Sequence, residues 1–207
     1  MKVLLLNGST RKNGCTFTAL SEIAKTLADE GIETEIMQLG GEPIRDCIGC
    51  GRCAELGKCV FGGDAVETLV EKAKTSDGFV FGSPVYYAHP SGNVQSLLDR
   101  AFYSGGRHFA HKPAAAVVSA RRAGTTASLD ALGKYFTINQ MPIVSSTYWN
   151  MVHGKTPDDV LKDEEGLQTM RNLARNMAYL LKCIEAGKAV GIEAPKPERA
   201  HRTNFIR

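Results

Sequence analysis

Residues 3–18 read V-L-L-L-N-G-S-T-R-K-N-G-C-T-F-T, an apolar run followed by a hydroxyl-rich loop and the start of a helical pattern. In a strand–loop–helix unit, the first amides of the helix lack intrahelical partners and carry the positive end of its dipole. Gly8 and Gly14 let the backbone approach a ligand closely. Four hydroxyl groups and one guanidinium in this segment can bind phosphate oxygens. They belong to Ser9, Thr10, Thr16, Thr18 and Arg11. The segment predicts a phosphate site, and the alternative is an ordinary loop with a threonine cap.

Composition indicates a globular chain with a sizeable core. Of the 207 residues, 43% are hydrophobic and 23% are charged, and the net charge is +3. Charges of both signs are interspersed without a basic stripe, which argues against a nucleic-acid partner. No apolar run reaches the length of a membrane span, and the first one is too short for a signal peptide, so we expect a cytoplasmic protein without a membrane partner. We expect a single domain over residues 1–207, with a cysteine-rich insertion at about 40–63 and a polar tail from about 187.

Short apolar runs alternate with helical patterns along the chain. The expected strands are residues 3–6, 33–39, 78–82, 114–118 and 142–146. The expected helices carry their apolar positions within residues 17–27, 65–73, 94–101, 129–136 and 167–184, and the last stripe places Cys183 in the core. Strands that are apolar on both faces predict an α/β fold, a doubly wound parallel sheet with helices on both faces.

Ligands of such sheets bind beyond the carboxyl ends of the strands. Three unusual loops follow expected strands there: the first loop (residues 7–16), the second loop (83–93) and the third loop (119–126). The first loop lacks both the Lys-Ser/Thr pair of a nucleotide loop and the G-x-G-x-x-G pattern, so it suits a single terminal phosphate.

The second loop offers a flat apolar and aromatic wall, formed by Pro84, Val85, Tyr86 and Tyr87. An isoalloxazine ring needs stacking area and amides at its polar edge. The alternative is that both tyrosines are ordinary packing aromatics. A monophosphate loop beside an aromatic loop points to FMN.

Two motifs carry a family resemblance: N-G-S-T-R-K-N-G-C-T at residues 7–16, and G-S-P-V-Y-Y at 82–87 followed by S-G-N-V-Q-S-L-L-D-R. They resemble the NADPH-dependent FMN reductase and flavodoxin-like superfamily, over residues 2 to about 183. The resemblance implies a flavodoxin-like fold with five parallel strands in the order 2-1-3-4-5. It further implies that Ser9, Arg11, Asn13 and Thr16 hold the FMN phosphate, that residues 84–87 cover the ring, and that the third loop from Ser119 to Gly124 lines its third side. Cys15 departs from the Asn or Ser that the family often has.

Residues 46–60 read D-C-I-G-C-G-R-C-A-E-L-G-K-C-V, which places Cys47, Cys50, Cys53 and Cys59 in a C-x2-C-x2-C-x5-C pattern. Successive three-residue spacings are typical of ferredoxin-like cluster loops, whereas zinc sites more often use two separated C-x2-C pairs. With this run, the chain is similar to the iron–sulfur flavoproteins, which implies a [4Fe–4S] cluster. The alternative is a loop that binds no cluster, as in some relatives.

These observations predict an FMN-dependent oxidoreductase that passes electrons between a donor, NAD(P)H or ferredoxin, and a small acceptor. We assign no side-chain acid or base. A cluster-free NAD(P)H:FMN or quinone reductase is the first alternative, and a redox-sensing flavin- or metal-binding protein without turnover is the second. Many relatives are dimers or tetramers, so we expect a homo-oligomer with a small-molecule or ferredoxin-like redox partner. Further candidates near the ligand are His89, His153, Arg121 and Arg122.

Overall fold

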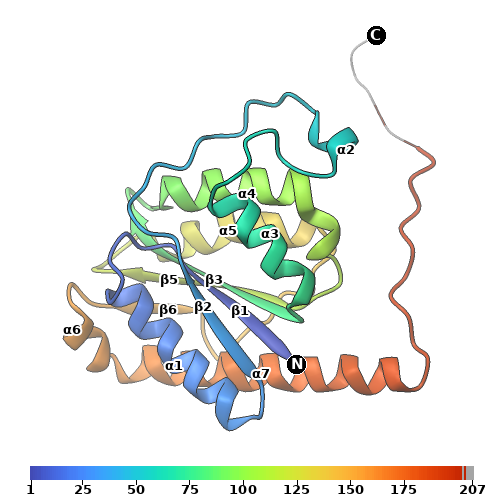
Figure 1. The fold of residues 1–207 in the computed structure, drawn as a ribbon. Helices are drawn as coiled ribbons and strands as arrows, with labels where there is room; N and C mark the ends of the chain where they lie inside the picture. The colour runs from blue at the N-terminus through green and yellow to red at the C-terminus, as the bar shows by residue number, and fades with distance from the viewer. Residues whose placement is uncertain (202, 204–207) are drawn as a thin grey trace.

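The computed structural model describes residues 1–201 and 203, and a parallel β-sheet lies at its centre (Figure 1). The last part of the predicted tail, residues 202 and 204–207, lies outside the described residues. The strands are β1 (Lys2–Asn7), β2 (Glu33–Gln38), β3 (Gly78–Tyr86), β4 (His89–Pro90), β5 (Ala114–Ala120) and β6 (Met151–His153). The helices are α1 (Cys15–Asp29), α2 (Cys53–Leu56), α3 (Ala65–Thr75), α4 (Gly92–Gly105), α5 (Thr125–Ile138), α6 (Pro157–Leu161) and α7 (Glu164–Ala189), and a 3-10 turn spans Gly106–His108.

The parallel strands follow the order β2-β1-β3-β5-β6, and β4 pairs antiparallel with the end of β3. Counted along the parallel strands alone, this is the expected 2-1-3-4-5 order, so the flavodoxin-like doubly wound fold is confirmed. The two-residue strand β4 was not expected, because it follows a turn that lacks glycine.

Alternating side chains of the strands build two cores. Leu4 and Leu6 face a core shared with α3, α4 and α5, whereas Val3 and Leu5 face a core shared with α1, α6 and α7. This alternation is the two-residue period of a strand. All seven residues of β5 are buried, as expected for a central strand covered on both faces. Figure 1 shows the two helical layers on opposite sides of the sheet.

The predicted fifth strand at residues 142–146 is wrong. Only a single bridge, from Ala114 to Ile143, forms there, and the strand that pairs with β5 is β6. Pro142 has no N–H to donate, so the ladder cannot extend before this bridge. The hydroxyl of Ser146 donates to the carbonyl of Thr169 at 2.7 Å, which turns the chain toward α7.

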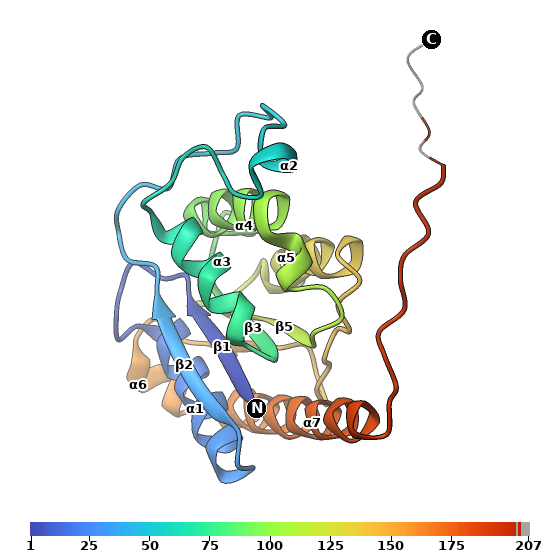
Figure 2. The ribbon, with the colours of Figure 1, turned by 45° about the vertical axis from the view of Figure 1, so that its right-hand side comes forward.

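Cys183 is exposed on α7, which contradicts its expected place in the core. Leu181 is the last buried residue of α7, so the helix leaves the core before Cys183, and its last turns extend past the start of β1 (Figures 1 and 2). Among the described residues, no helix has the length and hydropathy needed to cross a lipid bilayer.

Candidate functional site

The first loop is shaped by two amide side chains at neighbouring strand ends. Asn7 ends β1 and is paired in register with Gln38 at the end of β2. The Asn7 amide donates to the carbonyl of Lys12 at 3.2 Å, and the Gln38 amide donates to the carbonyl of Ser9 at 2.6 Å. Neither amide was predicted to have a role, although two polar residues at adjacent carboxyl ends of strands are a detectable signal. They fix the loop from inside and leave Arg11 exposed to solvent.

Hydroxyl groups in the first loop face two directions. Ser9 is buried, and its oxygen accepts the Arg11 N–H at 3.1 Å, which leaves the hydroxyl proton free to donate. Thr16 is also buried, and its hydroxyl lies 2.8 Å from that of Ser119 at the end of β5. Asn13 is exposed beside them. Of the four residues expected at a phosphate, Thr16 thus ties the first loop to the third.

Three helix N-termini that follow the loops lack a side-chain cap. The N-cap residues of α1, α4 and α5 are Gly14, Ser91 and Gly124, and none of them makes a side-chain capping hydrogen bond. By contrast, α3, α6 and α7 are capped by the side chains of Asp64, Thr156 and Asp163. Uncapped amides at a helix start are free to bind an anion or a polar ligand edge.

The second loop contains a tight hairpin with a strained turn. β3 continues beyond the expected Gly82 to Tyr86, and β4 returns through Tyr87 and Ala88, which have φ values of 48° and 63°. Two positive φ angles define a type I′ turn, which residues other than glycine and asparagine adopt at a cost. Tyr86 is half exposed and Tyr87 is fully exposed, so both rings are accessible to a ligand. The aromatic wall of Pro84, Val85, Tyr86 and Tyr87 lies on this hairpin.

Two glycines allow the three loops to meet. A Cβ on Gly8 would lie 2.1 Å from a methyl group of Val94 in the first turn of α4. Gly124, in the third loop, has a φ of +94°, and its Cβ would lie 2.6 Å from the Cα of Ala88. The sites predicted in three separate loops are therefore brought together at one edge of the sheet.

Other candidate residues lie around this edge. The ring of His153 contacts the carbonyl of Arg122 at 3.2 Å, and its backbone N–H donates to Asp163 at 2.7 Å, so His153 links the third loop to the start of α7. Cys15 is half-buried in the first turn of α1, and burial raises the pKa of its thiol, while the charge of Arg11 opposes this. Cys15 is therefore a neutral thiol at ordinary pH.

The cysteine segment (residues 40–63) crosses the outer side of α4, away from the sheet (Figures 1 and 2). All six cysteines of the chain are described, and each is a free thiol. Cys47, Cys50, Cys53 and Cys59 line one cavity of about 140 Å³, together with Arg100 and Tyr103 of α4. Among the described residues, no three His, Cys, Asp or Glu side chains converge on a position for a single metal ion.

Comparison with known proteins gives consistent results. Residues 1–156 match the NADPH-dependent FMN reductase family. The chain is 35% identical to an iron-sulfur flavoprotein of Methanocaldococcus jannaschii, over 89% of this chain and 100% of that protein. It is 24% identical to an iron-sulfur flavoprotein of Methanosarcina thermophila, over 91% and 99% of the two chains. Among solved structures, the flavoenzyme NAD(P)H:(acceptor) oxidoreductase FerB of Paracoccus denitrificans superposes with a TM-score of 0.65 at 17% identity, over 88% and 97% of the two chains.

Proposed function

This chain belongs to the NADPH-dependent FMN reductase family as an FMN-dependent oxidoreductase similar to iron-sulfur flavoproteins, and from that membership we propose where its cofactors bind. The observation that supports the flavin site is the junction of the three loops, held by the Thr16–Ser119 bond and by the approaches at Gly8 and Gly124. The three uncapped helix starts border the same junction. FMN, when bound, accepts a hydride or an electron pair and releases electrons singly or in pairs.

Each loop would contact a different part of FMN. Ser9, Arg11, Asn13 and Thr16, with the first amides of α1, would hold the phosphate. The hairpin of Pro84, Val85, Tyr86 and Tyr87 would cover the ring, and residues from Ser119 to Gly124 would line its remaining side. The amides at the start of α5 point a positive dipole toward that side, which favours negative charge on the ligand.

Arg11→Ala is expected to weaken FMN binding about tenfold, because it removes a charged hydrogen-bond donor from a dianionic phosphate. Riboflavin has the same ring system without the phosphate, so its affinity should not change. Fluorescence titration of flavin-free protein with both ligands measures the two effects separately. An equal loss of affinity for both ligands would place Arg11 at the ring. Unchanged affinity for both would show that Arg11 lies outside the site.

We also propose that Cys47, Cys50, Cys53 and Cys59 hold a [4Fe–4S] cluster. The supporting observation is that the four thiols line one cavity without converging on one point. A zinc ion needs its sulfur ligands grouped at about 2.3 Å from a single centre. A cubane cluster binds each thiolate at a different iron corner, so its ligands stand farther apart. A bound cluster would transfer single electrons to or from a ferredoxin-like partner.

One anaerobic experiment tests the cofactors and the donor together. Protein prepared without oxygen should show flavin absorption bands with a broad iron–sulfur shoulder, and iron and sulfide analysis should give about four of each per chain. Less than one iron per chain would favour the cluster-free NAD(P)H-dependent reductase. Stopped-flow mixing then distinguishes the donors: rapid bleaching of the flavin by NADPH indicates a reductase, and bleaching only by a low-potential carrier indicates an electron-transfer protein. A protein that binds FMN but reduces no acceptor with any donor would indicate a redox sensor.

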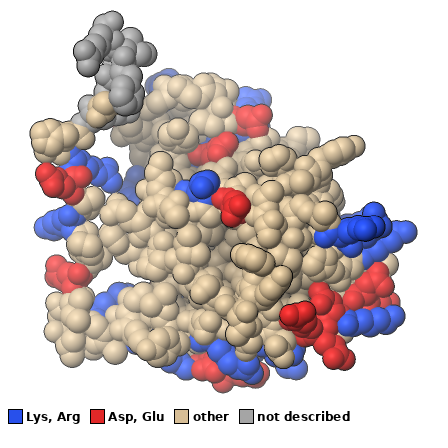
Figure 3. Space-filling view, turned by 180° about the vertical axis from the view of Figure 1, so that it is seen from behind, with Lys and Arg blue, Asp and Glu red and all other residues tan. Residues whose placement is uncertain are grey.

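We propose that residues 1–207 act as one FMN-binding domain that forms a homodimer or homotetramer in the cytoplasm. Free thiols in a chain of this kind favour a reducing compartment. The face seen in Figure 3, on the far side of the molecule from the view of Figure 1, has few charged side chains in its central area. Exposed Ile143, Tyr148 and Trp149 line a hollow of about 330 Å³ beside α5, which supports an interface there. A molar mass of one chain by light scattering would contradict it.

A further inference from the structure

Polar residues of α4 hold the cysteine segment from one side. The Asn93 amide donates to the carbonyl of Glu42 at 3.0 Å, and the Ser96 hydroxyl bonds the carboxylate of Asp46. Farther along, beyond the end of α4, Arg107 donates to the carbonyl of Gly57 at 3.2 Å. Within the part of the chain that the structure describes, the segment pairs with no strand of the sheet, so these side chains and Arg100, together with Ile44 packed against the core, attach it to the domain.

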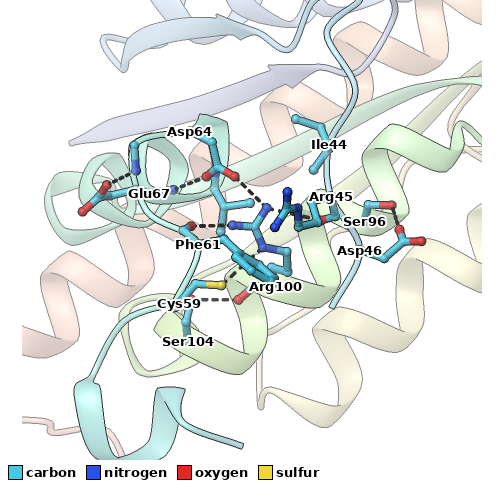
Figure 4. A network of polar contacts seen from close by, with 12 residues as sticks. Ile44, Arg45, Asp46, Cys59, Phe61, Asp64, Glu67, Ser96, Arg100 and Ser104 are labelled. Carbon is cyan, nitrogen blue, oxygen red and sulfur yellow. Dashed lines mark hydrogen bonds and ion pairs between the residues drawn. The ribbon is translucent and has the colours of Figure 1, made fainter. Parts of the chain in front are cut away.

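Arg100 is the centre of this attachment (Figure 4). Its side chain is only 1% exposed, which is rare for arginine and requires that its donors be paired. One Nη donates to the carbonyl of Arg45 at 3.2 Å and to the carboxylate of Asp64 at 2.6 Å, and the other donates to the carbonyl of Phe61 at 2.6 Å. Arg100 therefore joins the two ends of the segment that carries all four cysteines.

The remaining donor of Arg100 reaches a cysteine. Its Nε donates to the Sγ of Cys59 at 3.3 Å. A guanidinium keeps its proton in proteins, and that of Arg100 also pairs with the carboxylate of Asp64. The guanidinium is thus a permanent positive charge against one thiol, on the side of the cavity that is closed by α4.

Among the described residues, the sulfurs of the other three cysteines accept no hydrogen bond from a side chain. Cys47 and Cys50 are exposed, and Cys53 lies at the start of α2. Hydrogen bonds to ligand sulfurs, nearby charge and solvent exposure set the reduction potential of an iron–sulfur cluster. A buried guanidinium beside one thiolate favours the reduced cluster, because the reduced form carries one more negative charge.

We propose that Arg100 is a positioning residue for the cluster, which fixes the place of Cys59 and raises the midpoint potential of the bound cluster. This inference rests on the proposed [4Fe–4S] site. It assigns a function to a residue that touches neither iron nor flavin and that acts through the sulfur of Cys59.

The test compares Arg100→Gln and Arg100→Lys with a matched control, Arg107→Gln. Arg107 is exposed and bonds the same segment, but through a carbonyl and not a sulfur. The readouts are iron and sulfide per chain, the cluster potential from a redox titration followed by electron paramagnetic resonance, and the rate of tryptic cleavage after Lys58 in apoprotein. FMN content verifies that the sheet is intact in each variant.

At a fixed solution potential, Arg100→Gln is expected to lower the ratio of reduced to oxidised cluster about tenfold. For a one-electron couple, this corresponds to a midpoint potential that is lower by about 59 mV. Arg100→Lys should leave the midpoint potential close to the wild-type value, since it keeps the positive charge. It should speed cleavage after Lys58, because lysine lacks the forked guanidinium that joins the two ends of the cysteine segment. Arg107→Gln should leave the potential unchanged. Complete loss of iron from both Arg100 variants, with FMN and the Arg107→Gln cluster retained, supports the positioning of Cys59.

An Arg100→Gln cluster with the wild-type potential would overturn the inference while leaving the cluster proposal in place. Equal shifts in Arg100→Gln and Arg107→Gln would also overturn it, because a loosened segment would then explain both. Wild-type protein without iron would overturn the cluster proposal itself, and this inference with it.

Discussion

Alanine in place of any one of Cys47, Cys50, Cys53 and Cys59 is expected to reduce the iron content from about four atoms to less than one per chain, while FMN stays bound. Each thiolate would bind one corner of the cluster, so three ligands leave one iron without a protein ligand; once water removes that iron, the remaining cluster is expected to break down and release the other three irons. FMN should remain because the cysteine segment crosses the outer side of α4, whereas the three loops lie at the carboxyl edge of the sheet.

Anaerobic iron and sulfide analysis, together with the ratio of flavin to protein, measures this result. The chain offers a matched control in Cys183→Ala, since Cys183 is an exposed free thiol on α7. Full iron in the Cys50→Ala variant would contradict the ligand assignment. Equal loss of iron in Cys183→Ala would show that removal of any thiol, and not only of a cluster ligand, lowers the iron content.

Gly8→Ala is expected to destabilise the fold and weaken FMN binding together. The new methyl group would lie 2.1 Å from a Val94 methyl and 2.6 Å from the carbonyl oxygen of Gly82, and neither Val94 in the core nor a strand backbone can move away easily. Overpacking of this kind costs about 1–3 kcal/mol. For a chain of this size we expect Tm to fall by roughly 2–12 °C. The first loop and α4 would separate, and with them the two sides of the flavin site.

Thermal unfolding of flavin-free protein isolates the stability effect, and titration with FMN gives the binding effect. Gly92→Ala is the matched control: Gly92 starts α4, and an added Cβ there meets no atom within 4 Å. A Gly8→Ala protein with the Tm and FMN affinity of the control would show that the close approach of loop and helix has no role.

The sheet could be predicted from the sequence because its strands are apolar runs that are buried on both faces, as Val3 to Leu6 illustrate. The loops could be predicted because hydroxyl groups, glycines and tyrosines follow those runs directly. The fifth strand could not, since β6 has only three residues and pairs with β5 through contacts distant in sequence. Likewise, no turn residue marks Tyr87 and Ala88, so the hairpin depends on its surroundings.

Arg100 illustrates why part of the site was missed. In S-L-L-D-R it reads as a charged residue on the exposed side of a helix. Its burial depends on carbonyls of Arg45 and Phe61, which lie 55 and 39 positions away, and on the cysteine segment folding over α4. A spacing rule detects the cysteines because they are neighbours in the sequence. It cannot detect a partner that only the tertiary structure brings to them.

The attachment of the cysteine segment also has an evolutionary consequence. Its cysteines and α2 lie outside the helical layer and are anchored mainly by side chains, so no strand of the sheet depends on them. Mutations could therefore lengthen or shorten residues 47–59 in a lineage without breaking a strand pair, as long as Ile44 keeps its contact with the core and Arg100 keeps its partners. Related flavin domains could in this way differ in this segment while they keep the same sheet.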